Sequence, residues 1–181
     1  GVHEGPVARA ELLDGGHAVA LLALGHVVLG VDEVVDDGGR IDHGTMFGYA
    51  VREGLIDPRK SVQMGIRTTF TGETTMGFRI VYADEVHDSS SDQLAAIIRK
   101  QVGKSKAYLT FDIDCLDPSV APGTGTPIAG GMTYHQAASV IRKLTDVNFV
   151  AMDVVEVSPP YDHADITSIA GASLVMEYLC L

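Results

Sequence analysis

The chain of 181 residues is 46% hydrophobic and 20% charged, which is enough apolar material for a sizeable core, and we expect a single domain over residues 1–181. Its formal net charge of −11, from 24 acidic and 13 basic residues, argues against a nucleic-acid partner and against binding to an anionic membrane. The two cysteines lie far apart without a Cys-x-x-Cys pair, so neither a disulfide framework nor a zinc ribbon is indicated, and the cytoplasm is the expected compartment. No apolar run is long enough to span a bilayer.

From residue 61 onward, strand-like and helix-like segments alternate along the chain. This alternation predicts the α/β class, a three-layer α/β/α sandwich around a mostly parallel sheet. Ligands of such sheets collect outside the carboxyl ends of the strands. We predict strands over residues 62–67, 78–82, 107–112 and 149–155, and helices over residues 92–102, 134–144 and 165–179.

The most informative segment is Thr-Phe-Asp-Ile-Asp-Cys-Leu-Asp-Pro at residues 110–118. It places Asp112 and Asp114 two residues apart where an apolar strand ends, and side chains at this spacing share one face of a strand. Carboxylates prefer hard divalent cations such as Mg²⁺ or Mn²⁺, so the pair predicts a metal site. The alternative is an alternating surface strand, but residues 107–111 have the pattern of a strand buried on both faces.

A loop rich in proline and glycine follows, over residues 118–131. Its prolines fix φ, while Gly123 and Gly125 permit the backbone to approach a ligand or a neighbouring loop. The sequence therefore predicts a stiff loop beside the carboxylates. The alternative is a long crossover that faces solvent.

Five segments resemble, in order, those of the ureohydrolase family, the arginases and agmatinases. They are residues 42–47 (Asp-His-Gly-Thr-Met-Phe), 53–57, 62–67, 110–127 and 152–162, and the resemblance covers about residues 41 to 181. The Gly-Thr-Gly-Thr-Pro and His-Gly-Thr-Met-Phe runs favour the agmatinase and guanidinobutyrase branch. The resemblance implies an arginase-like fold, two Mn²⁺ ions and a homo-oligomer, either trimer or hexamer. It also implies hydrolysis of a small linear guanidino substrate such as agmatine to urea and an amine.

The resemblance also assigns roles to individual residues. Asp112 and Asp114 match metal ligands, and Asp117 is expected to cap the turn or support the ligands. His43 matches a histidine that moves protons near the substrate; the alternative is a structural His-Gly turn at the start of a helix. Glu156 matches the glutamate that pairs with the guanidinium group; the alternative is a core-edge glutamate paired with an internal arginine.

The first part of the chain departs from the family pattern. In Asp-Gly-Gly-His at residues 14–17, His17 is a candidate metal ligand, with an ordinary loop histidine as the alternative. Asp32 and Asp36 match two further ligands in spacing, but Val34 replaces a histidine ligand between them. Residues 1–36 match the family poorly, and the family's N-terminal segment is lacking. The alternative function is therefore a non-catalytic or truncated homologue with a defective metal site, and we expect this chain to release little or no urea.

Overall fold

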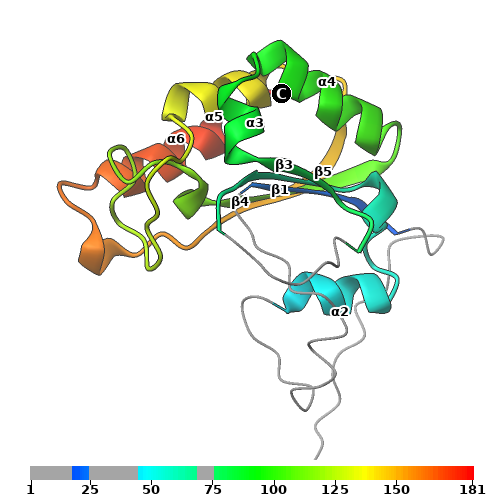
Figure 1. Cartoon of the computed structure of the whole chain (residues 1–181), viewed down its shortest axis with the longest axis horizontal. Coiled ribbons are helices and arrows are strands. Elements are labelled where there is room, and N and C mark those ends of the chain that lie inside the picture. The colour runs from blue at the N-terminus through cyan, green and yellow to red at the C-terminus, as the bar shows by residue number, and fades with distance from the viewer. Residues whose placement is uncertain (1–17, 25–44, 69–75) are drawn as a thin grey trace, which may run out of the picture.

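The fold is built on a five-stranded parallel sheet (Figure 1). The computed structural model describes residues 18–24, 45–68 and 76–181. The strand order is β3-β2-β1-β4-β5, and every neighbouring pair is parallel. The strands are β1 (Ala20–Leu24), β2 (Val62–Ile66), β3 (Arg79–Tyr82), β4 (Lys106–Asp112) and β5 (Asn148–Val155).

Helices lie on both faces of this sheet (Figure 1). Helix α2 (Met46–Arg52) covers one face, and α3 (Ala83–His87), α4 (Ser91–Val102), α5 (Tyr134–Arg142) and α6 (Ile166–Leu179) cover the other. Short 3₁₀ turns join several elements: η1 (Pro58–Lys60), η2 (Ile113–Cys115) and η3 (Pro159–Tyr161). The predicted three-layer α/β architecture is confirmed. Among the described residues, no helix is both long and apolar enough to cross a lipid bilayer.

The core consists of two apolar clusters on opposite sides of the sheet. The larger lies under α4, α5 and α6 and includes Leu22, Leu109 and Phe111, each with 2% or less of its surface exposed. The smaller includes Leu21, which packs with Phe47 of α2 and is joined by Tyr108 of β4. Neighbouring residues of β1 and of β4 thus contribute to opposite clusters. This confirms that residues 107–111 are buried on both faces, as a central parallel strand requires.

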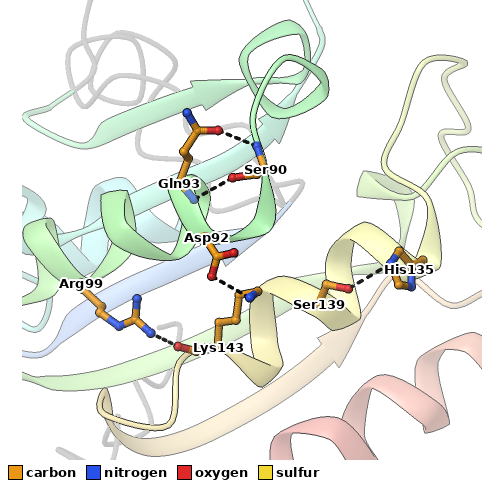
Figure 2. Close-up of polar contacts among 7 residues, drawn as sticks. All are labelled: Ser90, Asp92, Gln93, Arg99, His135, Ser139 and Lys143. Carbon is orange, nitrogen blue, oxygen red and sulfur yellow. Dashed lines mark hydrogen bonds and ion pairs between the residues drawn. The ribbon is translucent and has the colours of Figure 1, made fainter.

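Polar contacts fix where α4 begins and how α4 and α5 lie against each other (Figure 2). The Ser90 hydroxyl accepts a hydrogen bond from the Gln93 N–H while the Gln93 side chain accepts one from the Ser90 N–H, and this capping box starts α4. Lys143 Nζ lies 2.6 Å from Asp92 Oδ1, and Arg99 donates to the Lys143 carbonyl oxygen. Exposed ion pairs add little stability individually, so these contacts mainly set the relative position of two helices that already share a core.

The predicted elements agree with the observed ones to within about two residues at most ends. The omissions are β1, α2 and α3. Strand β1 has the sequence Ala-Leu-Leu-Ala-Leu, a short apolar run that periodicity alone cannot assign to a strand or a helix. Its pairing with both β2 and β4 makes it the central strand of the sheet. Only tertiary pairing identifies this segment of five residues as a strand.

Candidate active site

Asp112 and Asp114 lie together at the carboxyl end of β4, but not on one strand face as the sequence predicted. Strand β4 ends at Asp112, and Asp114 lies in the η2 turn. The Asp112 Oδ1 atom accepts a hydrogen bond of 3.0 Å from the Asp114 N–H. The prediction of a shared strand face is wrong because the chain turns at Ile113. The turn, and not the pleat of a strand, brings the two carboxyl groups close together.

Glu156 follows the neighbouring strand directly. Val155, the last residue of β5, pairs in register with Asp112, so Glu156 enters the same edge of the sheet. The φ of Glu156 is +65°, in the left-handed region that residues other than glycine adopt at a cost. The exposed Glu156 side chain therefore leaves the strand in a direction that an extended backbone would not give it.

Burial and neighbouring negative charge disfavour ionisation of Asp112 at this edge of the sheet. Only 5% of the Asp112 surface is exposed. Burial raises the pKa of Asp112 to about 8, and the charge of Asp114 and the smaller effect of Glu156 act in the same direction. A divalent cation would offset all three effects, because its charge favours ionised carboxylates.

The loop at residues 118–131 folds back over these carboxylates. The Thr126 hydroxyl donates a hydrogen bond of 2.9 Å to Asp114 Oδ2. Asp117 closes the base of the loop, because Oδ1 accepts from the Ser119 N–H at 3.0 Å and Oδ2 accepts from the Gly130 N–H at 2.8 Å. Asp117 therefore caps the turn, as its position after the aspartate pair predicted. The loop is held against the site and does not simply face solvent.

Arg67, just beyond the end of β2, is a structural part of the site that the sequence did not reveal. Its Nε and Nη2 atoms donate to the Ile128 carbonyl oxygen at 2.9 and 2.7 Å, and Nη2 also donates to the Asp114 carbonyl oxygen. One guanidinium group thus joins the far side of the loop to the backbone of Asp114. The available signal was the position of an arginine at the end of a predicted strand, at the edge where the carboxylates were expected.

Four predicted site residues, His17, Asp32, Asp36 and His43, lie outside the residues that the structure describes. Over residues 18–24, 45–68 and 76–181, no three histidine, cysteine or acidic side chains are grouped so that they could hold a metal ion. The structure therefore places Asp112, Asp114 and Glu156 at one edge and leaves the roles of the other four as predictions.

The chemistry of Asp112 and Asp114 fits part of a manganese site. Both provide carboxylate oxygens, which suit Mn²⁺ and Mg²⁺, at the end of a rigid buried strand. The Thr126 hydrogen bond to Asp114 is the kind of outer contact that fixes the orientation of a ligand. Glu156 lies beside this pair, directly after the adjacent strand.

Comparison with known proteins identifies the family. A sequence profile described as "Arginase family" matches residues 31–180, so the match begins ahead of residue 41 and includes Asp32 and Asp36. The agmatinase of Chromobacterium violaceum is 53% identical over 161 residues, which cover 88% of this chain and 49% of that protein. The agmatinase of Photorhabdus laumondii is 53% identical over 145 residues, covering 80% of this chain and 47% of that protein.

Solved structures give the same result. A hypothetical agmatinase from Burkholderia thailandensis superposes with a TM-score of 0.80 at 45% identity, covering 91% of this chain and 50% of that one. The proclavaminate amidino hydrolase of Streptomyces clavuligerus gives a TM-score of 0.79 at 38% identity, covering 90% of this chain and 56% of that one. The chain spans about half the length of the curated relatives it matches. With a profile match over most of its residues and relatives at this level of identity, the chain belongs to the arginase family.

Proposed function

We propose that this chain carries part of the active site of a binuclear manganese hydrolase that cleaves agmatine, or a similar linear guanidino compound, to urea and an amine. The observation that carries the proposal is the convergence of Asp112, Asp114 and Glu156 where β4 and β5 end side by side. Membership of the arginase family and the agmatinase names of the relatives support the same reaction class.

Each residue has a distinct task in this proposal. Asp112 and Asp114 hold manganese, together with His17, Asp32 and Asp36. When bound, the two metal ions supply a water molecule whose pKa is low enough for ionisation near neutral pH. Glu156 pairs with the guanidinium group and orients its carbon for attack. Water adds to that carbon, the bond from the carbon to the alkylated nitrogen breaks, and His43 delivers the proton that the leaving amine requires.

Agmatine is the proposed substrate because it has a guanidinium group and no carboxylate. Glu156 offers a carboxylate to the guanidinium, and the matched motifs contain no evident cluster of lysine and arginine for a substrate carboxylate. Arg67 is engaged with the carbonyl oxygens of Asp114 and Ile128. A competition assay with agmatine, guanidinobutyrate and arginine at equal concentrations tests this choice. A higher kcat/KM for arginine would refute it, and a preference for guanidinobutyrate would replace the substrate within the same reaction class.

A second candidate is a non-catalytic or truncated homologue with a defective metal site. The observation that favours it is Val34, which stands where the family pattern has a ligand histidine. Elemental analysis of the purified chain separates the two. Close to two manganese ions per chain supports the hydrolase, whereas one or none supports the defective homologue.

Two substitutions test the metal assignment directly. Asp112→Ala and Asp114→Ala should each reduce bound manganese, while Asp146→Ala, which removes an exposed carboxylate paired with Arg99, should leave it unchanged. Unchanged manganese in both site variants would refute the assignment. The proposal also includes a homo-oligomer in the cytoplasm, and light scattering coupled to size exclusion measures the oligomeric state.

A further inference from the structure

Asp162, six residues after Glu156, organises the start of α6. Its Oδ1 atom accepts hydrogen bonds from the N–H groups of His163 at 3.0 Å and Thr167 at 2.9 Å. Its Oδ2 atom accepts from the N–H and the hydroxyl of Ser168, both at 2.9 Å. Although burial opposes ionisation, the hydrogen bonds from Thr167 and Ser168 hold the pKa of Asp162 below its ordinary range. One carboxylate thus fixes the first turn of the helix.

Thr167 links the start of α6 to the loop at residues 118–131. Its side chain is fully buried, and its Oγ1 atom accepts a hydrogen bond of 2.7 Å from the Gly123 N–H. The Gly123 carbonyl oxygen in turn accepts from the Ser158 N–H at 2.8 Å. Gly123 is therefore bonded on both sides to the segment that follows Glu156.

The packing at Gly123 leaves no room for a side chain. A Cβ atom there would lie 2.6 Å from Asp162 Cβ and 2.8 Å from Asp162 Cα, closer than van der Waals contact. The close approach places the loop backbone directly against the residue that orders α6. This contact requires glycine because of distance and not because of an unusual φ.

The two ends of this arrangement are the two sides of the candidate active site. Three residues beyond Gly123, the Thr126 hydroxyl donates to Asp114. Two residues before Ser158 lies Glu156, whose charge acts on Asp112. Arg67 and Asp117 secure the base of the loop, so the contacts at Gly123 are what join its middle to the Glu156 side.

We propose that Asp162 and Thr167 are positioning residues that clamp Gly123, and through it hold Thr126 on Asp114 at a fixed place relative to Glu156. The effect of the clamp on metal and substrate binding rests on the proposed function. The clamp itself does not, because it is defined by hydrogen bonds and packing among residues that the structure describes.

The test measures amide hydrogen exchange by mass spectrometry on the folded chain, with Thr167→Val as the main variant. Valine keeps the buried shape but removes the acceptor of the Gly123 N–H, so exchange in peptides covering residues 123–126, and at Ser158, should accelerate about tenfold or more. Thr167→Ser retains the hydroxyl and should restore slow exchange. Thr145→Val, at an exposed threonine, is the matched control and should leave these peptides unchanged. A peptide from α4 reports any general loosening.

A second arm titrates Mn²⁺ by calorimetry into the same proteins and into Asp162→Asn. Affinity should fall about tenfold in Thr167→Val and Asp162→Asn and stay near the parent value in Thr167→Ser. Absence of Mn²⁺ binding by the parent chain would refute the proposed function, while the exchange result would still decide the clamp. Equal exchange at residues 123–126 in Thr167→Val and the parent, or equal behaviour of the valine and serine variants, would overturn the inference.

Discussion

Replacing Asp112 by asparagine should stabilise the metal-free chain while removing its metal binding. The side chain keeps its shape, and the Oδ1 acceptor of the Asp114 N–H is retained. What the substitution removes is a negative charge that burial and Asp114 disfavour in the folded state. Asparagine, which has the same shape but no charge, should therefore fit the metal-free site better than aspartate does.

The size of this effect follows from the pKa. Asp112 has a pKa of about 8 in the fold, against about 3.9 for an aspartate in an unfolded chain. One pKa unit corresponds to about 1.36 kcal/mol, so at pH 7 the folded state carries a penalty of up to about 4 kcal/mol. Relaxation around the partly exposed Asp114 reduces this, and we expect about 2 to 4 kcal/mol of stabilisation.

The raised pKa also determines how the stability gain of Asp112→Asn depends on pH. Because the pKa of Asp112 is raised in the fold, its contribution to the free energy of unfolding is fully present below about pH 4. This contribution is lost as the pH rises toward about 8. The advantage of Asp112→Asn should therefore be small at pH 4.5 and grow up to pH 8. Asp146→Asn, which removes an exposed carboxylate paired with Arg99, should show no such gain.

Urea denaturation in the presence of EDTA at several pH values measures these differences. Adding Mn²⁺ at about 1,000 times its Kd should reverse the order, because binding stabilises only the chain that holds the ion, by about 4.1 kcal/mol. A less stable Asp112→Asn chain in EDTA at pH 7, or an advantage independent of pH, would refute the electrostatic reasoning.

Three further outcomes are expected. Ser90→Ala should lower the free energy of unfolding by about 1 kcal/mol through loss of the capping box, measured by urea denaturation against Ser89→Ala; equal effects would contradict the cap. Hydrogen bonds from Ser119, and then from Gly130, lower the pKa of Asp117 to about 2, so its stabilisation is present above about pH 4 and is lost toward pH 2. Asp117→Asn should therefore be less stable at pH 6 and lose less stability on acidification. Finally, the chain should release urea from agmatine more slowly than about 1 per second, because Val34 replaces a histidine ligand of the family pattern; a faster rate in a colorimetric urea assay would contradict this.

The sequence by itself determined the α/β class, the family, and the edge of the sheet where the candidate site residues lie. These features can be predicted from short stretches of sequence, because a buried strand appears as an apolar run and its terminal carboxylates follow directly after it. Asp112, Asp114 and Glu156 were identified in this way. Their roles as metal ligands and substrate contact remain predictions.

The tertiary structure decided what depends on distant partners. Strand β1 lies at the centre of the sheet because it pairs with both β2 and β4. A run of five apolar residues does not by itself predict this pairing. Asp114 meets Asp112 through a 3₁₀ turn and not through a strand pleat. Arg67 and Thr167 hold the loop through hydrogen bonds that span 61 and 44 residues of sequence. Contacts over such separations leave no periodic pattern along the chain, so only the folded structure reveals them.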